Sequence, residues 1–66
     1  MRPWNPMEEI AQMNEGQLEG RKGSLEDYFN ACRQEKQGIN SKERAWYHAV
    51  CDRLEKEFGW KITRWQ

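Results

Sequence analysis

The feature that most constrains the fold is a stripe of apolar residues with helical spacing in the second half of the chain. Its members follow one another at intervals of three, one, three and four residues, which places them on one face of an α-helix: Tyr47, Val50, Cys51, Leu54 and Phe58. Asn40-Ser41-Lys42-Glu43 has the form of a capping box before the stripe, and Gly59 follows it as a typical helix-ending residue. The sequence predicts a helix that ends at residue 58, with Trp60 folded back on Leu54.

A second helix is predicted to begin at Ser24. Ser24-Leu25-Glu26-Asp27 resembles a capping box in which Asp stands where Glu is usual. Apolar residues then recur at helical spacing: Leu25, Tyr28, Phe29 and Cys32. The polar run after Cys32 reads as a solvated last turn, and Gly38 is a natural residue just beyond the helix end.

A first helix is predicted to follow Asn5. Asn is a favourable N-cap, Pro6 suits the first helical position, and acidic residues at 8 and 9 suit the positive end of a helix. Gly16 is a plausible stop. The segment from Gly16 to Gly23 holds three glycines and is interpreted as a loop, or as a frayed extension of the first helix.

These signals predict an all-α fold in a single domain that covers residues 1–66. The connection between the second and third helices is short, so the two helices must run antiparallel or cross as a corner. The expected architecture is a helical hairpin over residues 24–58, capped by the N-terminal helix. The C-terminal tail is expected to be a short strand or an irregular strap across the core.

Charge and hydropathy narrow the functional classes. Eleven basic and eleven acidic residues give a net charge of zero, which argues against a dedicated nucleic-acid binder and against an acidic DNA mimic. No apolar run approaches the ~18–20 residues of a membrane span, and the N-terminus lacks the apolar stretch of a secretory signal. We therefore expect a cytoplasmic protein with no membrane contact.

The cysteines and the histidine give little reason to expect an enzyme or a metal site. The hairpin offsets Cys32 from Cys51 by about 7.5 Å along the helix axis, beyond the ~4.4–6.8 Å between Cα atoms that a disulfide needs. His48 and these two cysteines are one ligand short of a structural zinc site, and His48 lies on the same helix as Cys51. The cysteines are expected to be small core residues, and no catalytic residue, metal or cofactor is predicted.

Two segments bear a partial likeness to phosphate-binding or nucleic-acid-binding motifs. Gly20-Arg21-Lys22-Gly23-Ser24 could cradle an anion, although a flexible connector is the simpler interpretation. Gly38 between two helices suggests a helix-turn-helix, but Gln34 and Arg44 occupy places where that motif wants a small and an apolar residue.

The tryptophans are the most unusual feature of the composition. Trp46 lies off the apolar stripe of its helix, and Trp4 and Trp65 lie near the two ends of the chain, where both rings could be buried together or could be exposed anchors. Trp, Tyr and Arg are the residues most often found at the energetic centre of interfaces. We therefore predict a partner-binding patch formed by Trp46, Arg44, His48, Arg53 and Trp65.

The second and third predicted helices also carry a family resemblance. A capped helix is followed by Ile39, a second capped start, and then Glu43, Ala45, Tyr47 and Asp52. In these features the segment from Ser24 to Arg53 resembles the central region of the Hha/YmoA small nucleoid-associated proteins. The family's Ala-Ala-Asp-His-Arg run is matched only by Val50-Cys51-Asp52-Arg53, and the flanking segments depart from the family. The resemblance implies a short, all-helical cytoplasmic protein that acts by binding another regulator.

The leading functional hypothesis is a small non-enzymatic regulator, inhibitor or adaptor that docks a helical aromatic face on a larger protein partner. Chains of this kind are commonly phage, prophage or bacterial accessory proteins, and a homodimer would bury surplus aromatic surface. The alternative is a nucleic-acid-associated transcription modulator, in the manner of Hha. It would use a local basic and aromatic patch formed by Arg21, Lys22, Lys61, Arg64 and Trp65.

Overall fold

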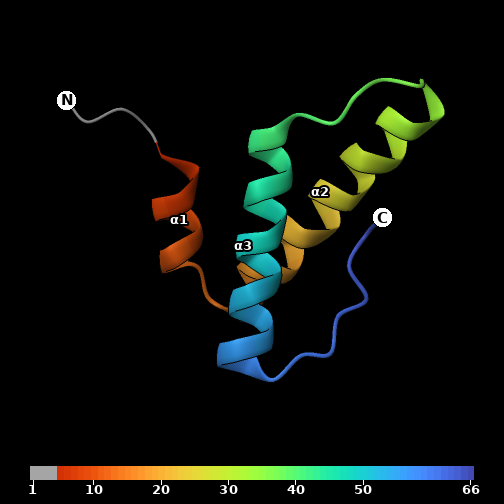
Figure 1. Cartoon of the computed structure of the whole chain (residues 1–66). Helices are drawn as coiled ribbons and strands as arrows, with labels where there is room; N and C mark the ends of the chain where they lie inside the picture. The colour runs from red at the N-terminus through yellow and green to blue at the C-terminus, as the bar shows by residue number, and fades with distance from the viewer. Residues whose placement is uncertain (1–4) are drawn as a thin grey trace.

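The structure, a computed structural model, describes residues 5–66 and confirms the all-α fold. It contains α1 (Pro6–Gln12), α2 (Glu15–Gln34) and α3 (Ser41–Phe58), with no strand in the described range. α2 and α3 run in opposite directions and pack together, and α1 packs on α3 (Figure 1). Residues 59–66 form an irregular strap that turns back from the end of α3 toward α2 (Figure 1). The predicted hairpin, N-terminal capping helix and irregular tail are therefore all present.

Three of the predicted helix ends are confirmed by their capping contacts. The Asn5 side chain accepts a hydrogen bond from the Met7 amide at 3.0 Å, and the Asn40 side chain accepts one from the Lys42 amide at 2.8 Å. At the end of α3, Gly59 adopts a left-handed conformation with φ of 73°, and the Trp60 amide donates to the Leu54 carbonyl. Asparagine caps and a left-handed glycine satisfy backbone groups that a helix end leaves unpaired.

The predicted start of α2 at Ser24 is wrong, because the helix begins nine positions earlier, at Glu15. Asn14 and Gln17 form a reciprocal capping box, with amide-to-side-chain distances of 3.0 and 2.9 Å. The segment 16–23 is therefore helical and not a loop, and α1 ends at Gln12 before reaching Gly16. Leu18 and Leu25 lie on one face of this helix and are 0% and 4% exposed. Their burial offsets the low helix propensity of the glycines.

The predicted end of α2 near Gly38 is also displaced. The helix stops at Gln34, and the left-handed residue that follows is Lys36, with φ of 57°. The Gln37 amide donates to the Cys32 carbonyl at 2.8 Å, which is the six-to-one hydrogen bond of a Schellman motif. Gly38 lies in the segment that connects α2 to α3.

The molecule is flat, with a shortest axis of 16 Å, and its core consists of two small clusters. The α1-side cluster contains Ile10, Met13, Leu18, Val50 and Leu54. The hollow-side cluster contains Leu25, Phe29, Tyr47 and Cys51. Trp46 and Ile62 are half-buried and pack against both clusters. Both cysteines are buried, as their positions on the stripes predict, whereas Phe58 is 39% exposed.

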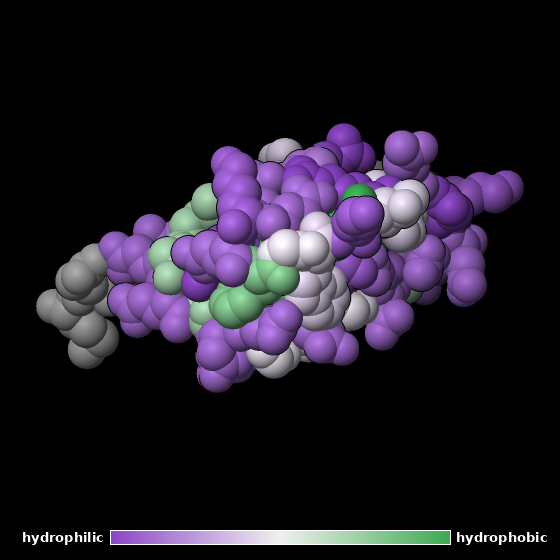
Figure 2. Space-filling view, turned by 90° about the horizontal axis from the view of Figure 1, so that it is seen from below, coloured by the Kyte–Doolittle hydropathy of each residue, from purple (hydrophilic) through white to green (hydrophobic). Residues whose placement is uncertain are grey.

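Most of the exposed residues in the described range are polar. Figure 2 shows one face of the molecule, on which the hydrophobic areas are small and separated by hydrophilic side chains. None of the described helices combines the length and the apolar character that crossing a bilayer requires.

The glycines inside α2 generate a prediction about stability. A Cβ atom at Gly20 or Gly23 would meet no atom within 4 Å, and neither residue has a positive φ. Replacing either by alanine should raise the free energy of unfolding by about 0.5–1 kcal/mol, because alanine favours the helix. Urea denaturation measures this change.

Gly59→Ala is the matched control for these substitutions. It also has open space around the added methyl group, but its φ of 73° strains an L-residue. The control should lower the free energy of unfolding by roughly 1 kcal/mol. Equal effects at the three positions would contradict the helical assignment of residues 16–23.

Candidate functional site

The candidate site is a hollow between α2, α3 and the strap. It has a volume of about 250 Å³, and its lining comes from all three elements and the connecting segment: Phe29, Ile39, Arg44, Tyr47, His48, Trp65 and Gln66. We call it the strap hollow. It exists because the strap brings Trp65 beside residues that lie 17 or more positions earlier in the chain.

Aromatic rings form one wall of the strap hollow. The Phe29 ring lies edge-on to Tyr47 with centroids 5.3 Å apart, and tilted against Trp65 with centroids 5.2 Å apart. The Arg33 guanidinium lies 4.3 Å from the centroid of the Trp65 ring, within cation–π distance. The Trp65 indole N–H donates to the Asn30 side chain at 2.8 Å. These contacts fix the plane of the Trp65 ring.

The hydroxyl of Tyr47 connects the strap to both long helices. It donates to a Glu26 carboxylate oxygen of α2 at 2.7 Å and accepts from the Trp65 amide at 3.0 Å. Lys22 donates to the same Glu26 oxygen at 2.9 Å. Burial and the hydrogen bond to Glu26 raise the pKa of Tyr47, so the hydroxyl keeps its proton. Burial acts to raise the pKa of Glu26, but the hydrogen bonds from Tyr47 and Lys22 outweigh it and lower that pKa.

Arg64 fixes the middle of the strap to α3. One of its terminal nitrogens donates to Asp52 at 2.6 Å and to Glu55 at 2.7 Å, and the other lies 2.9 Å from His48 Nδ1. The hydrogen bond from Arg64 lowers the pKa of Asp52 below its usual value. At the start of the strap, the Trp60 indole N–H donates to Glu15 at 2.7 Å. The strap is therefore held by polar contacts at its beginning, middle and end.

The structure brings together three of the five predicted patch residues. Arg44, His48 and Trp65 all line the strap hollow, and Arg44 is exposed and makes no ion pair within residues 5–66. Trp46 and Arg53 lie on the opposite side of α3, seven residues apart on one helix face. Trp46 is packed between the two core clusters. Trp4, whose ring was predicted to be either buried or exposed, lies outside the described residues.

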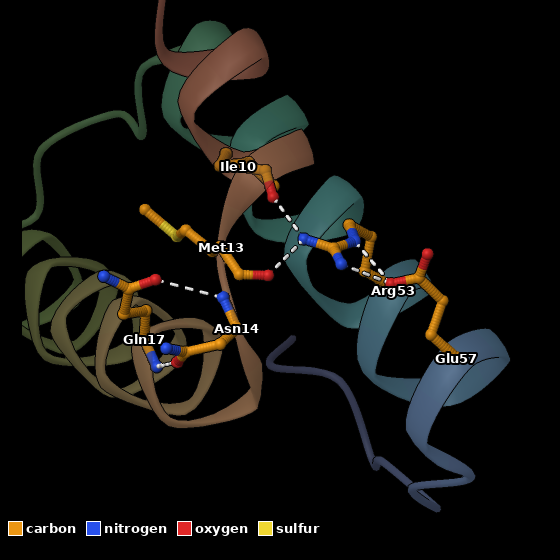
Figure 3. A network of polar contacts seen from close by, with 6 residues as sticks. All are labelled: Ile10, Met13, Asn14, Gln17, Arg53 and Glu57. Atoms are coloured by element: carbon orange, nitrogen blue, oxygen red, sulfur yellow. Dashed lines mark hydrogen bonds and ion pairs between the residues drawn. The ribbon is translucent and has the colours of Figure 1, made fainter.

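Arg53 docks α1 on α3, as Figure 3 shows. One terminal nitrogen of Arg53 donates to the carbonyls of Ile10 and Met13 at 2.7 and 2.6 Å. The Ile10 carbonyl also accepts from the Met13 amide at the end of α1, so Arg53 adds a charged donor to this helix end. The Arg53 Nε donates to Glu57 at 2.7 Å. The Arg53 side chain therefore belongs to the fold and does not reach the strap hollow.

Sequence reasoning missed the other residues that line the hollow. Phe29, Tyr47 and Ile39 were assigned to the core or to a connection, and no pattern marked Gln66. The shared helix face of Arg44 and His48 follows from their spacing of four residues. Which residues oppose that face depends on the path of the strap, for which the sequence gives no periodic signal.

The basic residues proposed for nucleic acid are mostly paired with carboxylates. Arg21 pairs with Glu9 at 3.0 Å and Lys22 with Glu26 at 2.9 Å, on a helix where an anion-binding loop was considered. A wider groove of about 550 Å³ lies beside Arg21 and Glu9, between α1 and α2, and polar side chains form most of its lining. Within residues 5–66, no three His, Cys, Asp or Glu side chains are grouped to hold a metal ion.

Comparison of the chain with protein-family models, with curated proteins and with solved structures gives no match. The Hha/YmoA resemblance stays a prediction from the residues that carry it.

The role of Arg53 can be tested by Arg53→Gln. The carbonyls at the end of α1 lose their charged donor, so the free energy of unfolding should fall by about 1–3 kcal/mol, and α1 should lose helicity in its NMR chemical shifts. Glu57→Gln is the control, because it removes only an exposed ion-pair partner, worth about 0.5 kcal/mol or less. Equal losses for the two variants would argue against docking of α1 by Arg53.

The role of the Tyr47 hydroxyl can be tested by Tyr47→Phe. The ring stays in place, but the Glu26 carboxylate and the Trp65 amide each lose a partner, so stability should fall by about 1–3 kcal/mol. The indole N–H signal of Trp65 should move toward its free position in NMR spectra. Tyr28→Phe makes the same chemical change at an exposed tyrosine and should alter stability by less than about 0.5 kcal/mol. An unmoved Trp65 signal in Tyr47→Phe would contradict this anchoring.

Proposed function

We propose that this chain is a small non-enzymatic binding protein and that a segment of a larger protein partner docks in the strap hollow. The observation that carries the proposal is the position of Arg44. It is an exposed cation without an ion pair in the described chain, and it stands beside a hollow walled by Phe29, Tyr47 and Trp65. Aromatic side chains and arginine at the rim of a hollow are the usual components of an interface hot spot.

The size of the hollow favours a side chain of a protein over a small-molecule ligand. Its volume of about 250 Å³ is below the ~300–1,000 Å³ of pockets that enclose drug-sized ligands. One or two side chains of a docked segment would fill it. A larger partner would then make further contacts on the surrounding polar surface.

The lining of the hollow supports a role without catalysis. The side chains that line it within the described residues include one imidazole but neither a thiol nor a carboxylate. The Nδ1 atom of His48 already contacts Arg64, and the hydroxyl of Tyr47 is engaged on both sides. A nucleophile with an adjacent base and an orienting group is the arrangement that covalent catalysis requires.

The proposal is tested by quantitative capture from a bacterial lysate with the intact chain as bait. Proteins that dock in the hollow should be retained by the wild type and lost with Arg44→Gln, whose fold is checked by circular dichroism. Lys42→Gln is the matched control, because it removes an exposed cation two residues away that does not line the hollow. If the captured protein is the chain itself, the homodimer predicted from the sequence is the partner. A set of captured proteins that is unchanged by Arg44→Gln would refute docking in the hollow.

A further inference from the structure

Two of the polar residues that line the strap hollow, Arg44 and His48, can donate hydrogen bonds. Arg44 and His48 are four residues apart on α3, which places them one above the other on the same helix face. The guanidinium of Arg44 can only donate and always carries its charge. It has no carboxylate partner among residues 5–66, in contrast to Arg21, Arg53 and Arg64. Arg44 is therefore available to donate hydrogen bonds to an anionic group of a partner.

The contact with Arg64 decides which nitrogen of His48 can donate. An arginine nitrogen has no lone pair to offer, so in the 2.9 Å contact Arg64 is the donor and His48 Nδ1 is the acceptor. A neutral imidazole carries one proton, which must then lie on Nε2. The Nε2–H points away from Arg64. His48 thus adds a second donor beside Arg44.

Apart from Gln66, the rest of the lining is apolar or aromatic. Ile39, Phe29 and Trp65 form a surface next to the two donors. The Trp65 ring is held in place by Phe29, Asn30 and Arg33, so it would lose little freedom when a side chain packs on it. A ligand that matches this surface has an anionic group next to an apolar one.

We propose that the strap hollow recognises an acidic segment of the protein partner. One carboxylate of the segment accepts hydrogen bonds from Arg44 and His48 Nε2, and a neighbouring aliphatic or aromatic side chain packs against Trp65 and Ile39. This inference rests on the proposed function and specifies the chemistry of the partner.

The charges around the hollow favour an isolated carboxylate over the phosphates of a nucleic acid. Asp52 and Glu55 surround Arg64 on the same side of α3 as His48, and Glu43 is adjacent to Arg44 in the sequence. A regularly spaced polyanion would meet these carboxylates, whereas one side-chain carboxylate would meet only the two donors. The net charge of zero also gives no long-range attraction for a polyanion.

The test begins with a phage-displayed library of random peptides, selected on the intact chain. The enriched sequences should share an Asp or Glu next to an apolar residue. A synthetic peptide with the enriched sequence should bind about tenfold more tightly than its Asn or Gln analogue, as measured by calorimetry. Arg44→Gln should weaken binding of the acidic peptide by a similar factor but should not further weaken binding of the amide analogue. Lys42→Gln should bind both peptides like the wild type.

The site of binding is read from the indole N–H signals of the tryptophans. The acidic peptide should shift the signal of Trp65 and leave that of Trp60 in place. If the enriched peptides shift Trp65 but carry no acidic residue, or bind Arg44→Gln unchanged, the carboxylate inference fails and the proposed function stands. If no peptide is enriched, or if the enriched peptides leave Trp65 unshifted, both fail. Binding of a single-stranded oligonucleotide that is lost in Arg44→Gln would overturn the preference for a protein segment.

Discussion

The hydroxyl group of Tyr47 is the point at which the two long helices and the strap are joined. The Tyr47 residue is almost completely buried, at 1% exposure, and its hydroxyl makes one hydrogen bond to α2 and one to the strap. Hydrogen bonds are stronger inside a protein than in water, and leaving a buried partner unpaired is costly. Paths of the irregular tail that leave the Glu26 carboxylate or the Trp65 amide without this hydrogen bond are therefore higher in free energy than the observed path. The position of the Trp65 ring, and with it the strap hollow, follows from this constraint.

The strap also completes the hydrophobic core of a flat molecule. Trp60 and Ile62 pack on the α1-side cluster, while Ile62 and Trp65 pack on the hollow-side cluster. A chain of this size buries a small fraction of its surface compared with larger domains, so each aromatic contact is important for stability. The strap hollow is consequently formed only when the strap packs against α2 and α3. A substitution that loosens the strap alters the binding surface and the stability together.

The sequence signals that proved correct were local ones. Asn5, Asn40 and Gly59 act within one turn of the helix ends that they mark, and their effect does not depend on the rest of the fold. The start of α2 was missed because the glycines between 16 and 23 were interpreted as a loop. Asn14 and Gln17 carried a capping signal at the correct place, and the tertiary burial of Leu18 decided in its favour.

Part of the candidate site was predictable because it also depends on local spacing along one helix. The helical repeat places Arg44 and His48 on one face, and it also separates them from Trp46 and Arg53. The contacts that define the site and dock α1 join residues far apart in sequence, 18 positions for the strap and 43 for Arg53 and Ile10. Such contacts depend on how the helices and the strap pack together, so no local sequence pattern predicts them. The sequence pattern predicts Phe29 and Tyr47 as core residues, and both do belong to the hollow-side cluster. That they also line the strap hollow does not follow from the pattern.

The placement of the three glycines in α2 has a consequence for the motions of the folded protein. All three precede Ser24, so the first half of this helix has a lower intrinsic tendency to stay helical than the second half. The first half is held by the burial of Leu18 and by side-chain pairs such as Arg21 with Glu9. Segments that depend on few tertiary contacts open before the global unfolding of a protein. We therefore expect the first half of α2, next to α1, to open more readily than the segment from Leu25 to Cys32, whose buried residues pack in the core.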